Sequence, residues 1–96
     1  MNNAVFNNIM ELVEKLKLEL SYLPLKGKDY IEALYIYKPS TKTGNFVNIF
    51  FYKDGKTNVV FWYEDENEHK DYTYSLFETI ENPSYLDLLL KFNYYL

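Results

Sequence analysis

The stretch that most constrains this chain is residues 45–64, where two β-rich runs flank the tripeptide Lys53-Asp54-Gly55. Both runs are rich in β-branched and aromatic residues, which favour strands. Asp-Gly between two such runs is a strong signal for a β-hairpin. The stretch therefore predicts two antiparallel strands around which the rest of the chain is organised.

The length of the turn decides which side chains share a face of the hairpin. A two-residue loop of Asp54 and Gly55 would set Lys53 opposite Lys56, and like charges opposed across two strands are unfavourable. A three-residue loop from Lys53 to Gly55, with the glycine left-handed, sets Tyr52 opposite Lys56 instead. A shift of one residue turns a whole strand over. We favour the three-residue loop because it gives one apolar face and one mixed face.

This register assigns each side chain of the hairpin to a face. The apolar face carries Val47, Ile49, Phe51, Thr57, Val59 and Phe61. The mixed face carries Phe46, Asn48, Phe50, Tyr52, Lys56, Asn58, Val60 and Trp62. Contact with solvent alone does not explain so much aromatic surface on the mixed face.

The two ends of the chain predict helices. Apolar residues recur at three- and four-residue spacing over residues 3–22, which indicates an amphipathic helix that ends before Pro24. Residues 83–95 predict a second helix, with Asn82 as N-cap and Pro83 at its first position. Apolar residues cover most of its circumference, so we expect the fold or a partner to bury it nearly all round.

Two further strands complete the predicted sheet. Residues 30–38 favour a strand because of their tyrosine and isoleucine content. Residues 72–78 alternate as a half-buried strand does, and the polar residues 64–71 are predicted to form the turn before it. Short connections favour a four-stranded antiparallel meander with the N-terminal and C-terminal helices packed on one sheet face. We predict a single α+β domain over residues 1–96.

The composition argues against most kinds of chemistry. There is no Cys, and the basic residues are all Lys, so neither a thiolate nor a guanidinium is available. His69 lies among carboxylates in a polar predicted turn, and the spacing of these residues matches no known metal-binding motif. No serine has the context of a nucleophile, and no glycine loop is suited to phosphate. We therefore expect no catalytic residue, no cofactor and no metal.

Composition also bears on partners and compartment. The formal net charge of −4 and the lack of Arg weigh against direct nucleic-acid binding. No apolar run approaches the roughly 18–20 residues of a membrane helix. The N-terminus carries no signal-peptide pattern, and we expect a cytoplasmic protein.

The acidic residues are concentrated in one part of the chain. Residues 64–81 hold seven carboxylates and one lysine. This stretch is either a solubilising loop or a surface steered toward a basic partner. If it binds a partner, adjacent aromatic residues would add contact area. The predicted partner-binding residues are Trp62, Tyr63, Glu64, Asp65, Glu66, Glu68, Asp71 and Tyr72.

These features favour a non-enzymatic binding protein. Aromatic residues make up 20% of the chain, more than a small core holds, so some are either scattered or part of an interface. The abundance of Asn, Lys, Tyr, Ile and Phe fits AT-rich coding, as in a low-GC bacterium or its phage. We expect a phage or mobile-element inhibitor of a basic host defence factor, such as a CRISPR nuclease. An immunity protein or antitoxin, and a homodimeric structural protein, are the alternatives.

Overall fold

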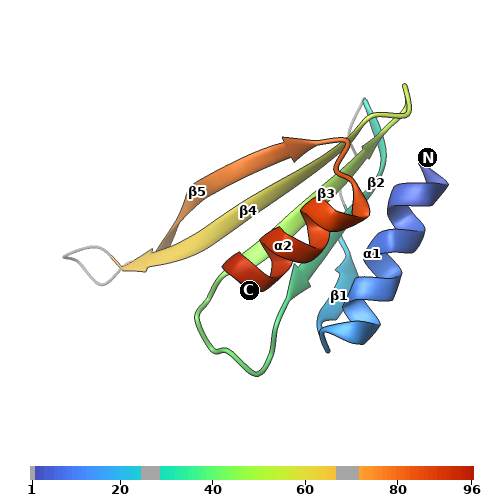
Figure 1. Ribbon diagram of the computed structural model, residues 1–96. Helices are drawn as coiled ribbons and strands as arrows, with labels where there is room; N and C mark the ends of the chain where they lie inside the picture. The colour runs from blue at the N-terminus through green and yellow to red at the C-terminus, as the bar shows by residue number, and fades with distance from the viewer. Residues whose placement is uncertain (1, 25–28, 67–71) are drawn as a thin grey trace.

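The computed structural model of the protein describes residues 2–24, 29–66 and 72–96. Within these ranges five strands form one antiparallel sheet in the order β1-β2-β3-β4-β5 (Figure 1). The predicted α+β class is confirmed. The elements are α1 (Asn3–Lys15), β1 (Glu19–Tyr22), β2 (Tyr30–Tyr37), β3 (Phe46–Tyr52), β4 (Thr57–Glu66), β5 (Tyr72–Glu81) and α2 (Tyr85–Tyr95).

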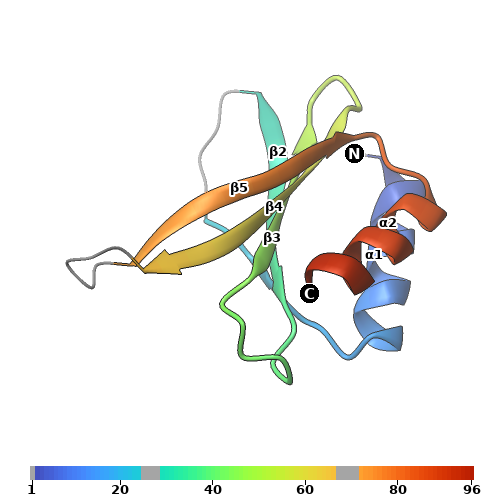
Figure 2. The same ribbon diagram turned by 60° about the vertical axis from the view of Figure 1, so that its left-hand side comes forward.

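The core lies between the two helices and one face of the sheet. Directly paired residues of neighbouring strands point to the same side, as Leu34, Ile49 and Val59 do. These side chains are fully buried in one cluster with residues of α1 and α2. Figure 2 shows both helices on this side, which we call the helix face. We call the opposite side the open face, because neither helix covers it.

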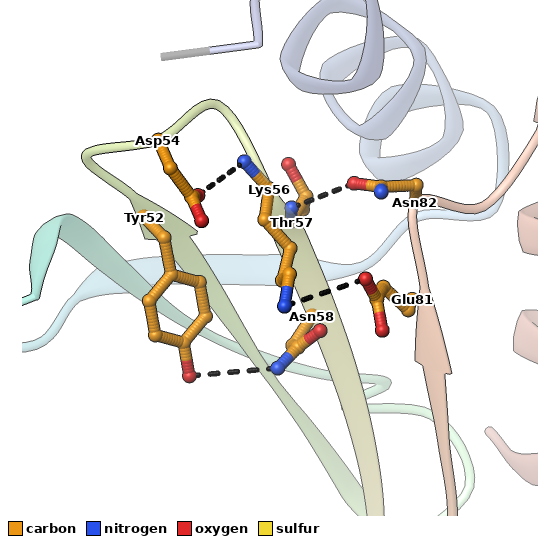
Figure 3. Close-up of polar contacts among 7 residues, drawn as sticks. All are labelled: Tyr52, Asp54, Lys56, Thr57, Asn58, Glu81 and Asn82. Carbon is orange, nitrogen blue, oxygen red and sulfur yellow. Dashed lines mark hydrogen bonds and ion pairs between the residues drawn. The ribbon is translucent and has the colours of Figure 1, made fainter.

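The predicted register of the central hairpin is confirmed. Gly55 has a φ of 91°, and its amide donates to the Tyr52 carbonyl at 3.1 Å. The Tyr52 amide donates to the Lys56 carbonyl at 2.8 Å. The Asp54 carboxylate accepts from the Lys56 amide at 2.9 Å, which closes the turn (Figure 3). The buried side chains of the hairpin are therefore the predicted ones, Val47, Ile49, Phe51, Thr57, Val59 and Phe61.

The prediction of four strands and of one helix over residues 3–22 is wrong. The helix ends at Lys15, and Glu19–Tyr22 forms a fifth strand that pairs with β2. Leu20 lies opposite Ile36 in this pairing. Leu20 also follows Leu16 by four residues, which fits a helix, so the apolar patterns of a helix and of a strand coincide over this segment.

A hydrogen-bonded turn stops α1 without a glycine. Lys17 is left-handed, with a φ of 56°. Its amide donates to the Glu14 carbonyl at 3.3 Å, and the Leu18 amide donates to the Val13 carbonyl at 2.8 Å. These two bonds form a Schellman motif. Leu18 is thereby turned into the core, where it is buried.

The last two strands are longer than predicted. β4 continues to Glu66, so the predicted turn over residues 64–71 is wrong at its start, and residues 67–71 lie outside the described residues. β5 runs to Glu81 rather than to residue 78. The ladder between β4 and β5 shifts register beside Phe61, which indicates a β-bulge.

The predicted start of the second helix is also wrong. α2 begins at Tyr85 and is capped by Ser84, which forms a capping box with Asp87. Asn82 instead extends the sheet. Its amide donates to the Thr57 carbonyl at 2.7 Å, and its side-chain oxygen accepts from the Thr57 amide at 2.8 Å (Figure 3). A left-handed conformation at Asn82, with a φ of 49°, then turns the chain toward α2.

The fold alone buries only one side of α2, so burial of its other sides by a partner stays a prediction. Leu88, Phe92 and Leu96 point into the core. Three side chains on another side form an exposed stripe, and their exposed fractions are 59%, 58% and 79% for Leu86, Leu90 and Tyr94.

The left-handed turn after α1 makes a testable prediction. Glycine adopts a positive φ without the steric cost that Lys17 bears, so Lys17→Gly should raise the free energy of unfolding by about 0.5–1 kcal/mol. The matched control Glu11→Gly, in the exposed middle of α1, should lower it by roughly 0.5–1 kcal/mol. Urea unfolding measures both changes. A loss of stability in Lys17→Gly would contradict the assigned turn.

Candidate functional site

The open face carries a cluster of five aromatic rings, which we call the five-ring cluster. Phe46 lies at its centre, with its ring centroid 5.1 Å from that of Tyr35, 6.3 Å from that of Trp62 and 5.0 Å from that of Tyr74. Tyr37 contacts Tyr35 at 5.7 Å. The rings come from β2, β3, β4 and β5, so the cluster extends across four strands.

Strand pairing places these rings together. Phe46 lies directly opposite Trp62, which lies opposite Leu76. The inner rings are half-buried by their neighbours, whereas Tyr37, Tyr74 and Leu76 are 40%, 56% and 52% exposed. The Trp62 indole N–H is buried and has no acceptor within the described part of the chain. The open face thus presents a contiguous and partly solvated aromatic surface.

The ends of β4 and β5 project beyond the rest of the sheet. β3 pairs with β4 only as far as Trp62, whereas the ladder between β4 and β5 continues to the pair of Glu66 and Tyr72. Residues 63–66 and 72–75 therefore form a two-stranded arm, which is visible in Figures 1 and 2. Glu64 and Asp65 are exposed on it. We call this segment the acidic arm.

The eight predicted partner-binding residues do not share one face. Trp62 and Glu64 point to the open face, and Tyr63 packs on the other side with its ring centroid 4.5 Å from that of Phe77. Because side chains alternate along a strand, Asp65 points to the same side as Tyr63 and away from that of Glu64. Glu66 and Tyr72 form the last residue pair of the arm, where only the backbone is described. Glu68 and Asp71 lie outside the described residues.

Four members of the cluster were not among the predicted site residues. They are Tyr35, Tyr37, Phe46 and Tyr74. A usable signal exists in the sequence, because the two tyrosines of β2 are two residues apart and Phe46 shares a hairpin face with Trp62. The signal requires the pairing of β2 with β3, which sequence alone does not fix.

Glu64 lies at the contact between the arm and the loop from β2 to β3. A Cβ atom on Gly44 would lie 2.2 Å from the Glu64 Oε2 atom, so this loop passes close to the glutamate side chain. Burial raises the pKa of the Tyr35 hydroxyl, and Tyr74, Tyr37 and Glu64 raise it further. A carboxylate is therefore held at the rim of the five-ring cluster.

On the helix face, α2 is joined to β5 at the bulge. The Tyr95 hydroxyl donates a hydrogen bond to the Glu78 carboxylate, and the Lys91 Nζ atom lies 3.0 Å from the same oxygen. The bond from Tyr95 and then that from Lys91 lower the pKa of Glu78. The same bond raises the pKa of Tyr95 to about 12. The Phe77 ring also stacks on Tyr95 at 4.6 Å, so both bulge residues point toward α2.

The described parts of the chain hold no cluster of possible metal ligands. Residues 2–24, 29–66 and 72–96 contain no group of three or more His, Asp or Glu side chains placed to hold a metal ion, and His69 lies outside them. A hollow of about 140 Å³ beside Tyr35 and Tyr37 is lined by Lys38 and Lys42 and by no carboxylate or histidine. Neither of the helices in these ranges is long and apolar enough to cross a membrane.

The contact between α2 and β5 predicts a pH dependence. Glu78→Gln should lower the free energy of unfolding at pH 7, because it removes a carboxylate whose pKa is depressed in the fold. The stabilising contribution of that carboxylate is present above its unfolded pKa, near 4.5, and is lost as the pH falls through the lower folded value. The difference in the free energy of unfolding between the variant and wild type, measured by urea unfolding, should therefore shrink below pH 4.5.

Tyr95→Phe is the matched variant for this measurement. It removes the hydrogen-bond donor that contributes most to the lowered pKa of Glu78. Its difference from wild type in the free energy of unfolding should therefore shrink over the same pH range. A difference that stays constant from pH 7 to pH 3 in both variants would contradict the assigned contact.

Comparison with known proteins assigns no family to this fold and surface. The sequence matches no family model, and no curated protein and no solved structure is significantly similar to it. Inference about function therefore starts from the open face and the acidic arm.

Proposed function

We propose that this chain is a non-enzymatic inhibitor that binds a basic protein through the open face and the acidic arm. The observation that carries the proposal is the five-ring cluster, which neither helix covers. Exposed and contiguous aromatic surface is typical of protein interfaces, and Trp and Tyr contribute most to binding energy there. Tyr37, Tyr74 and Leu76 are the members of this surface most available to a partner.

The charges around the cluster favour a basic partner. Glu64 lies opposite Tyr74 on the arm, and Glu81 lies on the open face opposite Asn58. Lys56 is the cation near Glu81, at 3.5 Å, in an exposed ion pair of small energetic effect. Carboxylates at the rim of an aromatic surface attract Lys and Arg and accelerate association with a basic protein.

The same charges argue against a nucleic-acid ligand. Aromatic rings on a sheet can stack with bases, but such surfaces also carry cations that contact phosphates. Here Glu64 lies beside the rings, whereas Lys38 and Lys42 line the hollow next to Tyr37. An open face of this charge is better suited to binding a protein partner that itself binds nucleic acid.

The target we propose is therefore a host defence nuclease, in the manner of an anti-CRISPR protein. The nucleic-acid channel of such a nuclease is basic, and an acidic aromatic surface complements it. A toxin neutralised by an immunity protein or antitoxin has the same requirement when its own active site is basic. The same binding surface would serve an inhibitor of a defence nuclease and a protein that neutralises a toxin, so only the identity of the target distinguishes the two functions.

The exposed stripe of α2 supports homodimerisation as a second candidate. Leu86, Leu90 and Tyr94 are the exposed apolar side chains of this helix. Stable interfaces bury about 800 Å² on each partner, and three side chains supply only part of that area. We therefore place partner binding on the open face.

Two matched double variants test the proposed surface. Glu64→Lys with Leu76→Lys reverses the charge and removes an apolar contact on the open face, and both side chains are exposed. Leu86→Lys with Leu90→Lys removes two exposed apolar side chains and adds two positive charges on α2, and serves as the control. Expression in bacteria that carry a panel of CRISPR nucleases, followed by phage plating, measures inhibition.

Wild type and the α2 variant should restore phage plating against a sensitive nuclease, and the open-face variant should not. A loss of about 2 kcal/mol at an interface hot spot lowers affinity roughly 30-fold. Equal inhibition by all three proteins would contradict the open face as the binding surface. Failure of wild type against every nuclease would instead refute the anti-CRISPR assignment.

A further inference from the structure

The outer edge of β5 is long and lacks two of the usual protections of an edge strand. β1, at the other edge, has four residues, whereas β5 has ten and, among the described strands, pairs only with β4. Natural edge strands are commonly protected by Lys or Pro, and β5 contains neither. Figure 1 shows β5 along the margin of the sheet, with no helix beyond it.

The hydrogen-bond pattern shows which residues of β5 face this edge. In an antiparallel sheet, successive residues of an inner strand bond alternately to its two neighbours. The bond between Tyr52 and Lys56 directs the even-numbered residues of β4 toward β3, and the bond between Asn82 and Thr57 directs the odd-numbered ones toward β5. The β5 partners of the even-numbered residues therefore turn their N–H and C=O groups outward. They are Tyr72, Tyr74, Leu76, Thr79 and Glu81.

The bulge divides this edge into two parts. Phe77 and Glu78 both turn toward α2, and an extra residue in a strand bends it and interrupts regular pairing. The part near α2 is thereby unsuited to a long additional strand. The part on the acidic arm is regular, and Tyr74 and Leu76 combine outward backbone groups with exposed side chains on the open face.

A second copy of this chain fits the edge poorly. Pairing of β5 with β5 of another copy would bring further carboxylates to Glu64, Glu78 and Glu81. The lysines beside them, Lys56 and Lys91, already pair with Glu81 and Glu78. A foreign segment with Lys or Arg would instead compensate Glu64, and its apolar residues would contact Tyr74 and Leu76.

We propose that the arm half of β5 accepts an extended segment of the partner as a sixth strand, paired at Tyr74 and Leu76. The segment carries apolar residues together with Lys or Arg. Main-chain hydrogen bonds give such strand addition its affinity, and alternate side chains give it specificity. The inference depends on the proposed function, because the same basic partner would cover the open face beside this edge.

A synthetic peptide tests the edge without the natural partner. The probe is an end-capped octapeptide of alternating Lys and Val, and the control is the same peptide with N-methylated alternate amides, which cannot pair. Added to ¹⁵N-labelled protein, the probe should slow the exchange of the outward amides of Tyr74 and Leu76 about tenfold, and the control should not. Equal effects of both peptides, or no slowing, would overturn the proposal.

Two variants at one position separate the backbone from the side chain. Leu76→Pro removes the outward N–H, and Leu76→Ala retains it while shortening the side chain. The probe should bind Leu76→Pro about tenfold more weakly than Leu76→Ala, as expected for one lost hydrogen bond. If Leu76→Pro does not fold, N-methyl-Leu76 introduced by chemical ligation makes the same comparison. Equal affinities would overturn the edge inference.

The outcomes distinguish this inference from the proposed function. Shifts in the signals of Phe46 and Trp62 without slowed exchange at Tyr74 and Leu76 would refute strand addition and leave the open face as the binding surface. Slowed exchange at the edge, combined with unchanged phage inhibition by the variant with Glu64→Lys and Leu76→Lys, would support strand addition and refute the proposed inhibitor surface.

Discussion

The left-handed turn at Gly55 determines the side on which the side chains of the sheet lie. Because strand residues alternate, the pairing of Tyr52 with Lys56 places Val59 under the helices and Val60 on the open face. β2 and β5 pair directly with this hairpin, so they adopt the same division. A turn shorter by one residue would turn one strand over, and that strand would bring its aromatic side chains into the core.

The hairpin could be predicted because several constraints agree on it. The Asp-Gly dipeptide marks the turn, repulsion between Lys53 and Lys56 and the apolar pattern favour the same register, and the structure has that register. β1 could not be predicted in the same way. Leu16 and Leu20 fit a helix, while Leu18 and Leu20 fit a strand, and the turn that decides between them uses Lys17 rather than a glycine.

The candidate site was only partly accessible to sequence reasoning. Trp62 and Glu64 were predicted and lie on the open face, but the other rings of the cluster come from strands whose pairing depends on tertiary structure. The bulge at Phe77 occurs together with the contact of Glu78 with α2, and no local pattern marks it. The bulge leaves the arm as the regular part of the free edge of β5.

Solvent accessibility of two adjacent valines tests the central claim most directly. Val59 is fully buried, and Val60 lies half-buried on the open face that we propose is uncovered in the free protein. A soluble paramagnetic gadolinium chelate should broaden the methyl signals of Val60 and Leu76 strongly and leave those of Val59 unchanged. Protection of Val60 and Leu76 equal to that of Val59 would show that the open face is already covered, and it would contradict this account of a surface kept for a partner.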